Sequence, residues 1–318
     1  MHSDHVLRVV RYQYVRDLQR TPFPNLKGMQ LEDFRSQVTE ISTQFEMASV
    51  ESAIDFMAGE YRPRRDLCLL TFDDGLKEHY TEVTPFLHEK RIRAVFFPIT
   101  GCLEEKKVAA VHMNHFLMAT MDPAEYAEGF YRKVAEMSPD ALASPQLDQA
   151  SAAEMFRWET PEVARFKYLF HFGLDSDLRD RAVRELFNEH IGDETTFAES
   201  LYLSWEDARK MQKAGMAIGG HTHQHKPLAN LSTQELTWDL ETCHRLLHEK
   251  LMPQSVWSFS YPYGKKDSFH LRAVRKLQQL NFRCAFSTEV GDNRRGADQF
   301  MVGRTSWKKA LTVTAAGV

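Results

Sequence analysis

The sequence has few cysteines, no long apolar run and no excess of basic residues, and each of these absences excludes a class of protein. Its four cysteines, Cys68, Cys102, Cys243 and Cys284, are scattered over 318 residues, so their spacing indicates neither a disulfide framework nor a thiolate metal site. No apolar stretch is long enough to span a bilayer. The 40 Lys and Arg residues are balanced by 44 Asp and Glu residues without a basic block, which argues against a nucleic-acid groove.

The amino end also lacks the marks of an export signal. Its first residues, Met-His-Ser-Asp-His, do not form the charged, apolar and small-residue sections of a secretory signal peptide. We therefore expect a cytoplasmic location. The length allows one large barrel or two domains.

The stretch from Asp66 to Gly75 is the strongest candidate for a functional strand. A short apolar run, typical of a strand buried on both faces, ends abruptly at Asp73 and Asp74. In parallel α/β folds the chemistry lies at the carboxyl ends of strands. Two adjacent carboxylates repel each other, so a proton or a cation must neutralise one of them. A surface Asp-Gly turn is the alternative interpretation.

Strand and helix patterns alternate on both sides of this stretch, which predicts an α/β fold with a parallel sheet. Between residues 102 and 200 helical patterns dominate, and we interpret this span as a helical insertion in one connection. The other strands are expected at 6–14, 94–99, 216–220, 256–261, 282–287 and 301–307, and helices at 31–41, from Ser49, around 83–87, from Ser204 to Gly215, from Ser232 and from Asp267 to Asn281.

Three histidines follow the expected strand 216–220, in the order His221-Thr222-His223-Gln224-His225. The imidazoles of His221 and His225 can bind one ion if the backbone turns between them. With one aspartate they form a site of two histidines and one carboxylate that keeps open positions. A polar loop without a ligand is the weaker alternative.

The second aspartate then has a chemical use. A divalent ion lowers the pKa of a water molecule, and a carboxylate beside the ion can take the proton. We assign Asp73 as the base and Asp74 as the metal ligand, although spacing alone does not order them.

A third candidate element is Tyr261-Pro262-Tyr263-Gly264, again after an expected strand. Proline restricts the preceding backbone and glycine frees the following one. The backbone N–H of Tyr263 can therefore be directed at the oxyanion of a tetrahedral intermediate. A simple turn is the alternative.

In this order, the three elements resemble the polysaccharide deacetylase family (NodB homology, carbohydrate esterase family 4). The resemblance rests on Thr71-Phe72-Asp73-Asp74-Gly75 and the two motifs above. It implies one distorted (β/α) barrel over residues 1–318, with the insertion at 102–200 inside it. It also implies metal-dependent removal of an N-acyl group, usually acetyl, from an amino sugar or glycan, with zinc as the metal and cobalt, nickel or manganese as alternatives. The roles it implies are Asp73 as the base that activates a metal-bound water, Asp74, His221 and His225 as metal ligands, and the Tyr263 amide at the oxyanion.

The sequence departs from the family pattern at two functional positions. Ser260 stands where the family often has the arginine that orients the base, and Arg304 is the candidate replacement. The late Leu-x-His motif that supplies the general acid is missing, since no histidine follows His270. Either Asp73 returns the proton itself or a group such as His223 does.

Three other functions stay open at this point. A carbohydrate-binding protein without activity fits the missing acid, and a non-haem iron oxygenase fits the bare metal-ligand set. An N-deformylase acting on a nucleotide- or lipid-linked amino sugar fits the missing export signal, whereas chitin- or peptidoglycan-like polymers are the alternative substrates. The oligomeric state is not indicated.

Overall fold

The computed structural model describes residues 5–142, 160–170 and 174–311. The chain divides into two compact units. The first consists of residues 1–17, 28–107 and 198–318, and the second of residues 18–27 and 108–197. Each unit is considered by itself.

A parallel sheet forms the first unit, with strand order β10-β1-β5-β6-β7 and with β4 paired to β5. Leu67 to Asp74 are all buried, as the apolar run predicts for a central strand. The strands of this sheet are β1 (Leu7–Tyr12), β4 (Glu46–Met47), β5 (Leu67–Asp74), β6 (Ala94–Pro98), β7 (Ala217–Ile218) and β10 (Thr305–Ser306), and a small second sheet pairs β2 (Val15–Arg16) with β3 (Met29–Gln30).

Single backbone bridges beyond β7 lead from this sheet through a further strand pair toward β10, in the manner of a distorted barrel. The Gly220 N–H donates to the Ser258 carbonyl (2.9 Å), which joins the end of β7 to β8 (Ser258–Ser260). The parallel pair β8–β9 (Cys284–Phe286) follows, and the Val302 N–H donates to the Ala285 carbonyl (3.0 Å) just before β10. Single bridges replace full ladders at two joints, which explains the distortion. The predicted NodB-type barrel is confirmed.

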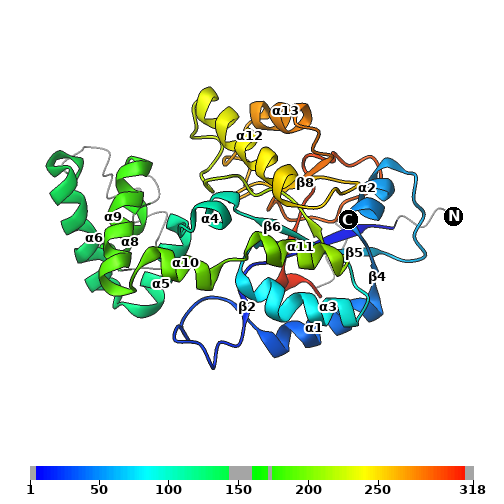
Figure 1. Ribbon diagram of the computed structural model, residues 1–318, viewed down its shortest axis with the longest axis horizontal. Coiled ribbons are helices and arrows are strands. Elements are labelled where there is room, and N and C mark those ends of the chain that lie inside the picture. Colours follow the sequence, from blue (N-terminus) through cyan, green and yellow to red (C-terminus); the bar gives the residue numbers. More distant parts are fainter. Residues whose placement is uncertain (1–4, 143–159, 171–173, 312–318) are drawn as a thin grey trace. The chain divides into compact units, whose positions relative to one another are not determined.

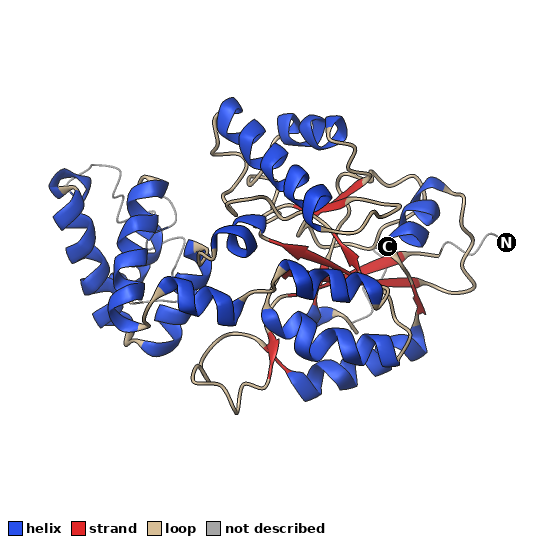
Figure 2. Ribbon diagram, in the orientation of Figure 1, coloured by secondary structure: helices blue, strands red, loops and turns tan. Residues whose placement is uncertain are grey.

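Helices lie outside the strands of this unit (Figures 1 and 2). Ser49, Ser204 and Ser232 each accept a backbone N–H at a helix start, as predicted. The prediction that Asp267 caps a helix is wrong, because the Ser268 N–H bonds to the Lys265 carbonyl in a turn and the helix begins four residues later. The helices are α1 (Leu31–Gln44), α2 (Val50–Ala58), the π-helix η1 (His79–Val83), α3 (Thr84–Glu89), α4 (Thr100–Glu105), α11 (Trp205–Lys213), α12 (Thr233–Lys250), α13 (Leu271–Gln279) and the 3-10 helix η4 (Trp307–Lys309).

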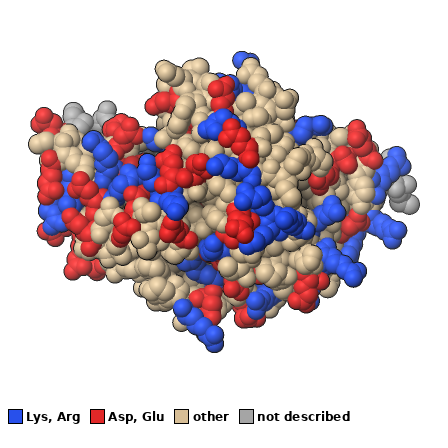
Figure 3. Space-filling view, in the orientation of Figure 1, with Lys and Arg blue, Asp and Glu red and all other residues tan. Residues whose placement is uncertain are grey.

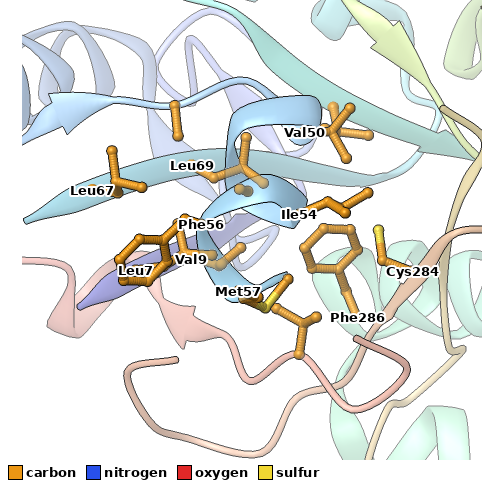
Figure 4. Close-up of a cluster of buried hydrophobic side chains, with 14 of the residues drawn as sticks. Leu7, Val9, Val50, Ile54, Phe56, Met57, Leu67, Leu69, Cys284 and Phe286 are labelled. Carbon is orange, nitrogen blue, oxygen red and sulfur yellow. The ribbon is translucent and has the colours of Figure 1, made fainter. Parts of the chain in front are cut away.

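The barrel interior is apolar at the amino ends of its strands (Figure 4). Alternate residues of a strand face the same side, and the side chains of Leu7, Val9, Leu67 and Leu69 belong to one buried cluster with residues of α2, β6 and β9. The next residues on the same faces of β1 and β5 are polar. They are Arg11, which is in register with Thr71, then Thr71 itself and Asp73. The interior thus changes from apolar to charged toward the carboxyl ends.

The described part of the second unit consists of helices and the loop 18–27, packed around aromatic rings. Phe116 and Phe197 lie 4.8 Å apart between ring centroids, and Phe23 lies 4.8 Å from Phe116. The boundaries 102–200 of the insertion stay a prediction. The helices are α5 (Ala110–Thr120), α6 (Pro123–Met137), the 3-10 helix η2 (Pro139–Leu142), α8 (Pro161–Tyr168), α9 (Ser176–His190) and α10 (Glu194–Leu201), whose last residues belong to the first unit.

Charges of both signs are interspersed over the face drawn in Figure 3. This distribution agrees with the balanced composition. Among the helices that the structure describes, none has the length and apolar character that crossing a membrane requires.

Candidate metal centre and active site

The carboxyl end of β5 delivers both aspartates into the interior of the protein. Asp73 and Asp74 are 2% and 1% exposed, so a surface turn is excluded for this pair. Asp74 has a φ of 79° and Gly75 a φ of 70°. The chain leaves the strand in this left-handed conformation, which glycine tolerates and aspartate rarely adopts.

The Asp74 carboxylate faces the two predicted histidine ligands. Its Oδ1 atom lies 3.4 Å from His221 Nε2 and 3.5 Å from His225 Nε2, and the two imidazole nitrogens are 3.2 Å apart. Nitrogen and oxygen ligands at 2.0–2.1 Å around a tetrahedral ion are separated by about 3.3 Å. The three buried groups therefore have the chemistry and the spacing to hold one divalent metal ion.

The other ring nitrogen of His221 is held by the backbone. Its Nδ1 atom lies 2.7 Å from the Ser260 carbonyl oxygen, which can only accept, so Nδ1 carries the proton and Nε2 offers its lone pair to a metal. Burial lowers the pKa of His221, but the Asp73 and Asp74 carboxylates outweigh burial and raise it above its usual value.

Asp73 is paired with the side chain of Arg304. Arg304 Nη1 donates to Asp73 Oδ1 at 2.8 Å, and its Nη2 donates to the Ser260 hydroxyl at 2.9 Å. Burial raises the pKa of Asp73, yet the Arg304 guanidinium and His221 outweigh burial and lower it. The carboxylate is therefore ionised at neutral pH. The guanidinium beside Asp73 comes from residue 304, just before β10, and its role as a replacement for the family's arginine stays a prediction.

Tyr263 lies beside the histidines. Its ring centroid is 5.4 Å from that of His225, and 42% of the residue is exposed. Its φ is 63°, so the turn places this residue in the left-handed region just before Gly264. The orientation of its N–H toward a substrate oxygen stays a prediction.

His223, the suggested proton donor, is engaged elsewhere. Its Nδ1 lies 3.1 Å from the Thr100 hydroxyl and its Nε2 lies 2.9 Å from Glu105 Oε1. With both ring nitrogens bound to these groups, His223 is a poor candidate for the general acid. Of the two residues named as proton donors in the sequence analysis, this leaves Asp73.

Two residues of the site were missed in the sequence. Gln13 Nε2 donates to Asp74 Oδ2 at 3.3 Å, and Arg11 brings a second guanidinium, whose pKa is lowered by burial and by Arg304. Both lie at the end of the first strand. In the sequence, only their position at the end of a strand could have pointed to them, because the strands of a parallel barrel end on the face where the site lies.

Unusual backbone conformations gather at the three motifs. Seven non-glycine residues of the described chain have positive φ, and four of them are Asp74, Thr222, His225 and Tyr263. Such conformations persist where the surrounding structure holds them, and they cluster at functional sites. Their distribution agrees with the position of the candidate metal centre.

The sequence matches the profile of the polysaccharide deacetylase family over residues 60–128 and 179–283, which together make up just over half of the chain. The chain belongs to the polysaccharide deacetylase family. A comparison with curated proteins finds no match. Family membership and the buried triad support a metal-binding carbohydrate deacetylase.

Solved structures of deacetylases share the fold of this family member. IcaB from Ammonifex degensii has a TM-score of 0.58 at 18% identity, with 96% of this chain and 95% of that chain covered. The deacetylase PplD of Streptococcus pyogenes, in complex with acetate, has a TM-score of 0.56 at 13% identity, with 96% and 93% covered. The BpsB deacetylase domain from Bordetella bronchiseptica has a TM-score of 0.55 at 16% identity, with 96% of each chain covered.

Proposed function

We propose that this protein is a metal-dependent hydrolase that removes an N-acetyl group from an amino sugar or glycan. The observation that carries the proposal is the gathering of Asp74, His221 and His225 within 4.8 Å of one another, next to the paired Asp73 and Arg304, in a chain of the polysaccharide deacetylase family. The family supports the reaction class, and the geometry supports the roles.

In this proposal Asp74, His221 and His225 hold a divalent ion, for which we propose zinc. When bound, such an ion lowers the pKa of water and polarises the acyl carbonyl. The two imidazoles and one carboxylate leave open positions for water and substrate. A bare two-histidine, one-carboxylate set also occurs in iron oxygenases, but the ionised Asp73 beside it favours hydrolysis.

Asp73 acts as the general base. Arg304 holds its Oδ1 atom, which leaves Oδ2 to accept the proton as water attacks the carbonyl carbon. The Tyr263 backbone N–H faces the developing oxyanion. The C–N bond then breaks, and Asp73 returns the proton to the amine nitrogen, so that the products are a free amino sugar and acetate. This return by Asp73 replaces the missing histidine acid.

The acyl group and sugar are tested by product release. Purified protein is analysed for metal by mass spectrometry and then screened for acetate and formate on polymeric N-acetylglucosamine and on nucleotide-linked amino sugars. We expect about one metal ion per chain and release of acetate. Release of formate alone would replace the deacetylase with a deformylase, and glycan binding without product from the metal-loaded protein would favour a non-catalytic role.

A cytoplasmic location stays a prediction.

A further inference from the structure

The backbone of the histidine loop, residues 221–225, is bound by one carboxylate from helix α12. The His223 N–H donates to Asp239 Oδ1 at 2.8 Å, and the Gln224 N–H donates to Asp239 Oδ2 at 2.9 Å. Asp239 is 1% exposed. In the part of the chain that the structure describes, no Lys or Arg forms an ion pair with it. The Asp239 carboxylate is therefore stabilised directly by two consecutive backbone N–H groups. Burial of a carboxylate without such hydrogen bonds lowers the stability of the folded protein.

A second side chain of α12 continues this contact one turn later. Cys243 is fully buried, and a Cβ atom on Gly220, next to His221, would lie 3.1 Å from its Sγ atom. Residues four apart on a helix lie on the same face. Asp239 thus binds the N–H groups of residues 223 and 224, and Cys243 packs beside the start of the loop on the same face of α12.

The loop is also held by the first two residues of helix α4. The Thr100 N–H donates to the Thr222 carbonyl at 3.1 Å, and the Gly101 N–H donates to the His223 carbonyl at 3.0 Å. A Cβ atom on Gly101 would lie 2.4 Å from the His223 carbonyl oxygen, so this close approach requires glycine. The backbone of the histidine loop is therefore bound both by helix α12 and by the start of helix α4.

This double support matters because the loop conformation is unfavourable by itself. Thr222 and His225 have φ values of 64° and 58°, a region that costs about 1–3 kcal/mol for each non-glycine residue. The spacing of the His221 and His225 nitrogens depends on that conformation, because the chain must turn back within four residues.

We propose that Asp239 is a positioning residue for the metal centre, which holds the histidine loop in the conformation that brings the two imidazoles together. The inference rests on the proposed metal site. Groups that orient metal ligands contribute about 10–100-fold to metal affinity, and we expect an effect of this size from Asp239.

The test compares Asp239→Asn with Ser232→Ala. Asparagine has the shape of aspartate, but its amide nitrogen cannot accept one of the two N–H groups. Ser232 caps the same helix, so Ser232→Ala weakens α12 without touching the loop. For each full-length protein, the dissociation constant of Zn²⁺ is measured by competition with a chromophoric chelator. The absorption bands of the Co²⁺-loaded protein and the melting temperature of the metal-free protein are also recorded.

We expect Asp239→Asn to weaken Zn²⁺ binding about 10–100-fold and to change the Co²⁺ spectrum, while Ser232→Ala lowers only the melting temperature. Wild-type affinity and spectrum in a folded Asp239→Asn protein would overturn the proposal and leave Asp239 a structural role. If that variant does not fold, Asp239→Glu decides, because it keeps both carboxylate oxygens but moves them by one methylene: a several-fold weaker affinity supports the proposal, and an unchanged affinity overturns it. Absence of Zn²⁺ binding in the wild type would instead refute the metal site itself.

Discussion

The two ends of the barrel interior are formed by the same strands, but one end is apolar and the other is charged. At the amino ends, Leu67 and Leu69 of β5 pack in an apolar cluster. Two and four residues beyond Leu69 the same face carries Thr71 and Asp73, bound to Arg304. Apolar burial stabilises the first end by about 25 cal/mol per Å² of buried apolar surface. At the second end, buried charged side chains are stabilised by their ion pairs and hydrogen bonds with one another.

This difference separates the residues that keep the barrel folded from those that carry its chemistry. Substitutions in the apolar end should change stability and spare the metal centre. Substitutions in the charged end should change metal binding or turnover well beyond their effect on stability. The following variants test this separation, from the largest expected effect on turnover to the smallest.

Removal of a metal ligand should have the largest effect. We expect His221→Ala to lose stoichiometric metal and measurable turnover, because the proposed site has three protein ligands among the described residues. Metal content is measured by elemental analysis after purification. His270→Ala, which changes an exposed histidine, is the control and should keep full occupancy. Full occupancy in His221→Ala as well would show that this imidazole is not a ligand.

Removal of the base should spare the metal but not the reaction. We expect Asp73→Asn to keep its metal and to lower kcat about 10²–10⁴-fold, the usual contribution of a general base. Acetate release is measured beside Asp267→Asn, an exposed aspartate outside the site. Unchanged turnover in Asp73→Asn would remove Asp73 from the mechanism.

Loss of the Arg304 guanidinium should change both the stability of the protein and the pH dependence of its activity. Arg304→Leu leaves the Asp73 carboxylate buried without its partner, which costs about 3–5 kcal/mol of unfolding free energy. Arg304 helps to lower the pKa of Asp73, so its removal raises that pKa. The base is active only when ionised, and the acidic limb of the kcat/KM profile should therefore move to higher pH.

Arg304→Lys is the matched variant for this pair. Lysine keeps the charge but not the planar set of donors, so we expect a smaller shift of the acidic limb. A profile identical to that of the wild type in Arg304→Leu would show that the guanidinium does not act on the base.

A cavity at the apolar end should have the smallest effect on turnover. Leu69 is fully buried, and Leu69→Ala should lower the free energy of unfolding by about 2–5 kcal/mol, measured by urea denaturation of the metal-free protein. Metal affinity and kcat below the melting transition should stay at wild-type values. A loss of metal affinity comparable to that of Asp239→Asn would show that the two ends are not separate.

The sequence predicted those parts of the site that are encoded by short strand-end motifs. Asp73, Asp74 and the histidine pair could be found because two carboxylates after a buried strand, and three histidines in five residues, are chemically unusual. Arg304 could be proposed only as a replacement for a missing arginine, since its contact with Asp73 joins residues 231 positions apart.

Other features depend on tertiary contacts that no local pattern reveals. The bonds of Asp239 to the histidine loop and of Gln13 to Asp74 form only when the barrel is assembled. The links from the main sheet to the pair β8–β9 are single bridges at Gly220 and Val302, which no periodic pattern in the sequence reveals. The start of α13 was misplaced because a local turn at Ser268 competes with a helix cap at Asp267.

Anomalous diffraction from crystals of the zinc-loaded protein, recorded on both sides of the zinc absorption edge, tests the central claim most directly. We expect one peak at about 2.0–2.2 Å from Asp74 Oδ1 and from the Nε2 atoms of His221 and His225, with Asp73 outside the coordination shell and bound to Arg304. A peak at other residues, or Asp73 as a ligand in place of Asp74, would contradict it.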